Sequence, residues 1–219
     1  GPQGSPEVAR QADALLGDAL DDEAPQVRSE AFRTLWAWHP NDPDAPLTRG
    51  ARSRHGDVRG EVVKELARLQ RKYPRADEML LALCRDAVAA VALAAYDVFT
   101  KDGDKDAAEK ARHRKRPEVH LAAMASPRPE VRARAAQGCI HAPAAALRTR
   151  LVELIREDRA EVFLAAIEAY DKLLPREQEG FVAAFASPYW ELRVRAAELL
   201  GQRRDDRATA PMRALLVIP

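Results

Sequence analysis

The residues best suited to bind a charged ligand gather in one polar stretch of the 219-residue chain, residues 101–116. The second half of this stretch carries five formal positive charges within seven residues. Such a cluster can contact a phosphate backbone or an acidic protein surface. No aromatic residue lies among the cations, so stacking on single-stranded bases is not predicted. The alternative is a solvated loop. The cations are Lys110, Arg112, Arg114, Lys115 and Arg116.

The first half of the same stretch resembles the beginning of a calcium-binding loop, with aspartates at positions 102, 104 and 106. A complete loop needs a glycine at its sixth position and a glutamate at its twelfth. Those places hold Ala107 and His113. The histidines elsewhere contain no pair at the three- or four-residue spacing that suits a metal on one helix face. We therefore expect no metal and no cofactor.

Motifs for covalent catalysis and for nucleotide binding are missing from the sequence. It contains no Gly-x-Ser-x-Gly and no glycine-rich phosphate loop. Cys84 and Cys139 lie inside apolar runs without metal-ligand spacing, which predicts two small buried side chains in a reducing compartment. The formal net charge of +1 does not indicate a dedicated nucleic-acid binder. The sequence thus gives no support for an enzyme.

A short pattern recurs along the chain, first as Pro-Gln-Val-Arg at residues 25–28. Its apolar third residue serves as an anchor. Neighbouring anchors are separated by 31, 31 and 30 residues, and one pair is separated by a longer gap. A fixed period of this size is typical of a solenoid. Apolar residues four and eight positions after each anchor predict a helix with a buried stripe. The anchors are Val27, Val58, Val131, Val162 and Leu192.

A sixth copy is predicted in the gap, with Val88 as its anchor and Ala92 and Tyr96 on its buried stripe. An apolar segment precedes each anchor, so each copy should be a helical hairpin. The predicted fold is all-α, an α-solenoid of about six hairpin repeats with an insertion at residues 101–116. The predicted repeats are 6–38, 46–71, 76–100, 116–140, 145–173 and 175–201, followed by a partial repeat at 208–219.

Residues 6–219 are predicted to form this single solenoid, whereas residues 1–5 resemble the remnant of a cleaved expression tag. The apolar stretch at 215–219 lacks the polar cap that a solenoid end normally carries, which predicts a fragment of a larger protein. No apolar run approaches the ~18 residues of a membrane span, so we expect no membrane partner and a cytoplasmic location. The Ala- and Arg-rich composition suggests a bacterial source.

The second helix of the repeats opens on similar segments, such as Pro-Glu-Val-Arg-Ala-Arg-Ala-Ala at residues 129–136. These segments resemble HEAT repeats, most closely the short class named after phycobilisome lyases, over roughly residues 6–216. The resemblance implies an armadillo-like helical solenoid. Most members of that family are adaptor surfaces, and a few bind DNA or handle chromophores. Ala89 and Phe163 depart from the pattern, because they replace the arginine that follows the anchor.

That arginine is the first candidate binding group, because it recurs at one position beside the buried stripe. In a functional interpretation these arginines line the inner face and meet an acidic partner or phosphates. In a structural interpretation each pairs with a carboxylate in the first turn of an adjacent repeat and orders the stack. The set consists of Arg28, Arg59, Arg132 and Arg193.

Further candidates lie on the outer surface of the second helices, at Arg33, Lys64, Arg134 and Arg195. Trp36 and Trp38 are two residues apart and cannot share a helix face, so at least one should reach a groove or the surface. Aromatic side chains are favoured at interfaces, although core filling would also explain the pair.

The sequence favours a non-catalytic scaffold that binds a protein partner with the ridge or concave face of the second helices. The alternative is nucleic-acid binding through the inner arginines and the basic stretch, as in HEAT-like DNA glycosylases. The catalytic and base-probing residues of that class cannot be located here. A chromophore lyase is a third and more remote alternative.

Overall fold

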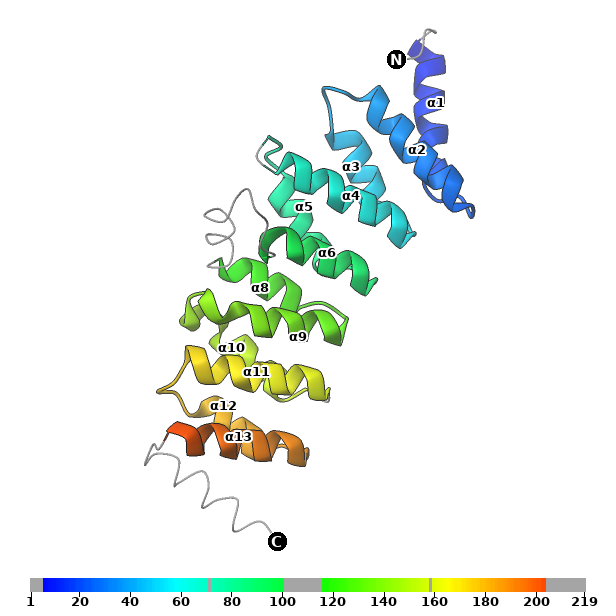
Figure 1. Cartoon of the computed structure of the whole chain (residues 1–219). Coiled ribbons are helices and arrows are strands. Elements are labelled where there is room, and N and C mark those ends of the chain that lie inside the picture. The colour runs from blue at the N-terminus through cyan, green and yellow to red at the C-terminus, as the bar shows by residue number, and fades with distance from the viewer. Residues whose placement is uncertain (1–5, 71, 101–115, 158, 204–219) are drawn as a thin grey trace. The chain divides into compact units, whose positions relative to one another are not determined.

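The computed structural model describes residues 6–70, 72–100, 116–157 and 159–203, and within these ranges every regular element is a helix (Figure 1). The basic residues at 110–115 and the partial repeat at 208–219 lie outside the described residues. The chain divides into two compact units, an N-terminal unit (residues 1–98) and a C-terminal unit (residues 99–219). Both consist of helical hairpins, so the predicted all-α solenoid is confirmed.

In the N-terminal unit, α1 (Pro6–Ala19) pairs with α2 (Pro25–Trp38), and α3 (Asp44–Arg52) pairs with α4 (Gly56–Leu69). The third hairpin has α5 (Ala76–Leu83) and α6 (Ala89–Thr100), whose last two residues belong to the C-terminal unit. The second helices α2 and α4 contact each other, and α4 also contacts α5. Consecutive repeats therefore bury their apolar faces against one another.

The C-terminal unit stacks three hairpins in two layers (Figure 1). One layer contains α8 (Pro117–Met124), α10 (Ala144–Ile155) and α12 (Glu179–Phe185). The other contains α9 (Pro129–Gly138), α11 (Ala160–Leu173) and α13 (Trp190–Arg203), and a 3-10 turn (Cys139–His141) follows α9. Within each layer, the middle helix contacts both of its neighbours.

Local sequence explains where the second helices begin. Pro25 and Pro129 occupy opening helical positions, where no backbone N–H is needed. Asp57, Glu161 and Glu191 put a negative charge in the first turn, where it interacts favourably with the helix dipole. The sequence pattern therefore specifies the same starting point in successive repeats.

The buried stripe follows the predicted spacing in four repeats, where Val58, Val131, Val162 and Leu192 are buried anchors. In the first repeat Val27 is exposed, and α2 buries Arg28, Ala31, Phe32 and Leu35 instead.

The predicted anchor of the third repeat is wrong by three residues, although Ala92 and Tyr96 of its predicted stripe are buried. Val88 is 38% exposed and precedes α6, whereas Val91 is 3% exposed and continues into the buried Ala95 and Phe99. The anchor of this repeat is therefore Val91. The backbone N–H of Val88 donates to Asp86 Oδ1 at 2.7 Å, which holds this segment in the turn before the helix.

Both cysteines are free thiols in the core, as predicted. Burial raises the pKa of each thiol, Cys84 and Cys139, to about 12. These thiols are therefore protonated at neutral pH and behave as small apolar groups. Among the described helices, none combines the length and the hydrophobicity needed to cross a membrane.

Candidate functional site

The recurring arginines lie at the junctions between consecutive repeats. Arg28, at the start of α2, is buried, and its Nε and Nη2 donate to Asp57 Oδ2 in the next repeat at 3.1 and 2.5 Å. Its Nη1 donates to the backbone carbonyls of Asp22 and Glu23, both at 2.8 Å. One guanidinium therefore links a carboxylate of the following repeat to the turn of its own repeat.

Arg59 makes the same kind of link one repeat later. Its Nε and Nη2 donate to the two carboxylate oxygens of Asp86 at 2.5 and 2.8 Å, and its Nη1 donates to the carbonyl of Ser53 at 2.6 Å. The two side chains of this pair are only 12% and 5% exposed. This is a bidentate and largely desolvated ion pair.

Arg132 repeats the arrangement in the C-terminal unit. Its Nε and Nη2 lie 2.8 and 2.7 Å from Glu157 Oε2, and its Nη1 donates to the carbonyl of Ser126 at 2.9 Å. Arg193 donates in the same way to the carbonyl of Ser187 at 2.7 Å. Within the described part of the chain, Arg193 meets no carboxylate.

The third and fifth repeats lack this arginine and supply an acceptor instead. Asp86 and Glu157 occupy equivalent positions, five residues before the anchors Val91 and Val162. Six residues after them stand Ala92 and Phe163, where other repeats have arginine. Phe163 stacks on Tyr189 of the following repeat, with ring centroids 5.3 Å apart. An aromatic contact therefore replaces the ion pair at that junction.

The hydrogen bonds from Arg28 hold the pKa of Asp57 below its ordinary value of 3.8. A carboxylate with a depressed pKa stabilises the fold above its unfolded-state pKa, and this contribution is lost as the pH falls through the folded-state pKa. Replacing Asp57 with asparagine should therefore lower stability at neutral pH and flatten its acid dependence. Urea unfolding at a series of pH values measures this. The same replacement of the exposed Asp18, which has no ion pair in the described residues, should leave the profile unchanged.

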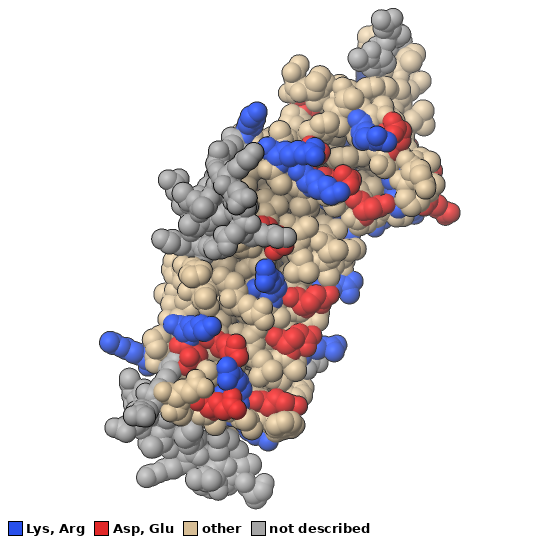
Figure 2. Space-filling model, viewed as in Figure 1, with Lys and Arg blue, Asp and Glu red and all other residues tan. Residues whose placement is uncertain are grey.

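The outer candidates lie on the second helices of each unit, and we use the name ridge for these four residues, Arg33, Lys64, Arg134 and Arg195. Arg33 and Glu30 lie 2.5 Å apart with side chains 72% and 66% exposed, and Lys64 forms a similar pair with Glu61. Arg134 is exposed, and half-buried Arg195 contacts both Glu168 and Glu198. Figure 2 shows basic and acidic side chains side by side on the viewed face. Exposed pairs of this kind are weak and can be exchanged for a partner's groups.

The remaining candidates are scattered. Trp36 and Trp38 are both half-buried on α2, and the ring of Trp36 lies 6.3 Å from that of Phe32. Arg116 is the one described residue of the basic stretch, and it contacts Glu118 at 2.7 Å and lies over the ring of Phe99. The described structure therefore does not bring Trp36, Trp38 and Arg116 together into one site.

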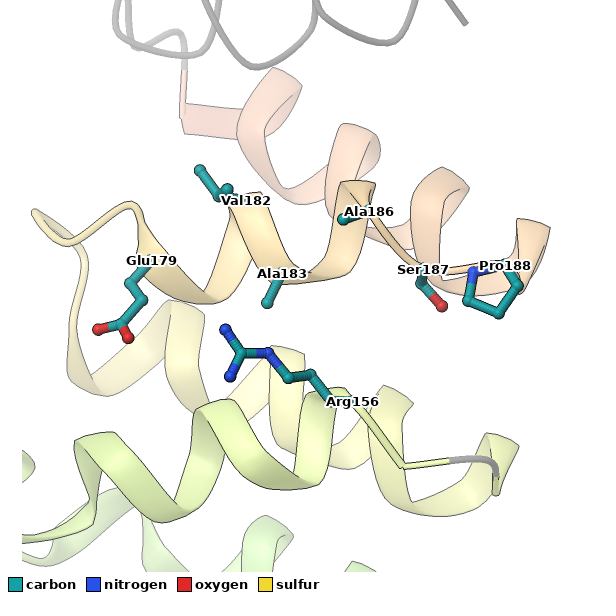
Figure 3. Close-up of a pocket in the computed structure, with 7 residues that line it drawn as sticks. All are labelled: Arg156, Glu179, Val182, Ala183, Ala186, Ser187 and Pro188. Atoms are coloured by element: carbon teal, nitrogen blue, oxygen red, sulfur yellow. The ribbon is translucent and has the colours of Figure 1, made fainter.

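A cavity of about 450 Å³ beside α12 was not predicted from the sequence. In Figure 3, Arg156 reaches from the end of α10 toward Ala183, while Val182 points away from both. No sequence signal marks it, because its lining is one arginine among many and several small residues. Among the described residues, no cluster of His, Cys, Asp and Glu could hold a metal ion. The lining residues are Arg156, Glu179, Val182, Ala183, Ala186, Ser187 and Pro188.

Residues 13–99 match the family model described as HEAT repeats. This match supports HEAT repeats over residues 13–99 of the chain, and membership of the phycobilisome-lyase class remains a prediction. The crystal structure of YibA from Escherichia coli is similar over 96% of this chain and 80% of that one, with a TM-score of 0.49 and 17% identity. A search of curated proteins gave no match. HEAT repeats generally act as scaffolds for protein interactions, because stacked repeats present extended surfaces.

Proposed function

We propose that this chain is a non-catalytic scaffold that binds a protein partner through the ridge. The observation that carries the proposal is that one set of cations binds neighbouring repeats while another set is exposed to solvent. The guanidinium groups of the inner arginines, Arg28, Arg59 and Arg132, bind carboxylates of neighbouring repeats. The side chains of Arg33, Lys64 and Arg134 are exposed. The exposed cations are therefore the groups that a partner can reach without opening the junctions.

The same division supports a protein partner over nucleic acid. Phosphates would have to displace Asp57, Asp86 and Glu157 from the inner arginines, which costs several kcal/mol where the pair is desolvated. The ridge also mixes the two signs, since Glu30 and Glu61 stand beside its cations. A mixed surface complements a mixed protein surface better than a uniformly negative phosphate backbone. The free, buried cysteines favour a reducing compartment, so we place this scaffold in the cytoplasm.

Site-specific photocrosslinking in the source cell tests the proposal. A photoreactive residue at position 33, 64 or 134 should trap the same protein in each case. Matched positions are Ala82 on α5 and Thr149 on α10, which are exposed on first helices and should trap none of it. Trapping from Ala82 and Thr149 but not from the ridge would contradict the proposal.

A further inference from the structure

Large exposed apolar side chains are concentrated in the first and last described repeats. In the first repeat, Val8 and Leu15 on α1 and Val27 on α2 are exposed, and Leu15 reaches 69%. In the last repeat, Trp190 is 63% exposed. Val182 and Val194 are exposed there as well, and apart from these six the described chain has one such residue, Val88.

The repeats between these two cover the positions equivalent to Val27 and Val182. Val58, Val131 and Val162 are the counterparts of Val27, and all three are buried. Val152 on α10 is the counterpart of Val182 and is also buried. Val27 and Val182 therefore lie on faces that a neighbouring repeat covers elsewhere in the chain, and burying them would be favourable.

In the last repeat, one edge of the Arg193 guanidinium has no hydrogen-bond acceptor among the described residues. Arg193 donates Nη1 to the carbonyl of Ser187, as Arg59 does to Ser53 and Arg132 to Ser126. In Arg59 and Arg132, Nε and Nη2 then hold a carboxylate of the following repeat. Within the described residues, Nε and Nη2 of Arg193 have no such partner.

The first repeat carries the matching acceptor. Asp22 lies five residues before the anchor Val27, the same place that Asp86 and Glu157 hold in their repeats. Its Oδ1 accepts the backbone N–H of Ala24 at 2.7 Å, just as Asp86 Oδ1 accepts that of Val88 at 2.7 Å. Asp86 also receives Arg59, whereas Asp22 is exposed and has no ion pair in the described part of the chain.

We propose that two copies of this chain associate head to tail, the first repeat of one copy stacking on the last repeat of another. Asp22 of the second copy then meets Arg193 as Asp86 meets Arg59, and Val27 and Leu15 cover the apolar face around Trp190 and Val194. The contact is heterologous, so it can add further copies and its extent depends on concentration.

Sedimentation velocity over a wide concentration range tests this association. The wild-type chain should grow beyond a monomer as concentration rises. Asp22→Arg and Arg193→Asp each place like charges together, and each should weaken association by about tenfold or more. An equimolar mixture of the two variants should restore association, because both junctions between one variant and the other pair opposite charges.

Two controls have the same charge reversals outside the proposed pair, Glu23→Arg and Arg176→Asp, and should associate like the wild type. Trp190→Ala, which removes an exposed side chain and leaves the contact with Ser187 intact, should weaken association even if Arg193→Asp perturbs its own turn. Circular dichroism melts establish that each variant is folded.

A wild-type chain that stays monomeric throughout overturns the proposal, and the end faces are then covered by other residues of the same chain. Association that is unchanged in Trp190→Ala and in Asp22→Arg also overturns it.

Discussion

Replacing Asp86 with alanine is expected to lower the free energy of unfolding of the N-terminal unit by about 2–4 kcal/mol. The change leaves the guanidinium of Arg59 largely buried with only the carbonyl of Ser53 to accept from it. It also removes the acceptor for the backbone N–H of Val88 before α6. Urea unfolding followed by tryptophan fluorescence measures the effect. A Trp190→Phe background restricts this signal to Trp36 and Trp38 in the N-terminal unit.

The double variant Arg59→Met/Asp86→Leu measures the free energy of the interaction between the two side chains, apart from the effect of losing either one. Removing both charges avoids an uncompensated buried ion, so the double variant should cost less than the sum of the two single changes. Glu30→Ala is the matched exposed case, because it removes one partner of the ion pair with Arg33, and it should change stability by at most ~0.5 kcal/mol. Equal losses from Asp86→Ala and Glu30→Ala would contradict the claim that the inner arginines join repeats.

The second large effect is expected at Gly180, in the first turn of α12. A Cβ there would lie 2.7–2.8 Å from three ring carbons of Tyr170, closer than such atoms approach in proteins. The ring is fully buried and packs edge-on against Phe181, with centroids 6.0 Å apart, so it has little room to yield. Gly180→Ala should therefore destabilise the C-terminal unit by about 1–3 kcal/mol.

Gly60 in α4 provides the opposite case. A Cβ at Gly60 meets nothing within 4 Å, so Gly60→Ala should gain about 0.5–1 kcal/mol from the lower backbone entropy of the unfolded chain. Urea unfolding followed by circular dichroism compares the two variants. A neutral or stabilising Gly180→Ala would mean that the close packing around Tyr170 is wrong.

Most of the fold can be predicted from the sequence because the anchors recur with apolar residues at helical spacing. The third repeat shows where this fails. Val88 and Val91 are three residues apart, and both start a plausible stripe, through Ala92 and Tyr96 or through Ala95 and Phe99. The structure buries both of these stripes, and the two anchors differ because Val91 is covered and Val88 is exposed. Asp86 holds Val88 in the turn before α6 and binds Arg59, a contact between repeats that helical periodicity does not contain.

The candidate site is harder to predict because the acceptors do not share the period of the arginines. Arg28, Arg59 and Arg132 reach carboxylates 29, 27 and 25 residues further along the chain. A search at one fixed offset therefore finds the donors but not their partners. Two interpretations of the arginines remain open in the sequence, and only the packing of adjacent repeats shows that Arg28, Arg59 and Arg132 bind carboxylates of neighbouring repeats.

Two neighbouring arginines of α9 allow the most direct test of the central claim, that inner arginines join repeats while ridge cations bind the partner. Arg132 holds Glu157 with its side chain 14% exposed, whereas Arg134 is exposed on the ridge. The measurement is the yield of photocrosslinked partner from position 64, taken well below the melting temperature. We expect Arg132→Gln to lower the melting temperature and keep the yield, and Arg134→Glu to keep the melting temperature and reduce the yield about tenfold. A folded Arg132→Gln that loses the partner while Arg134→Glu retains it would contradict the account.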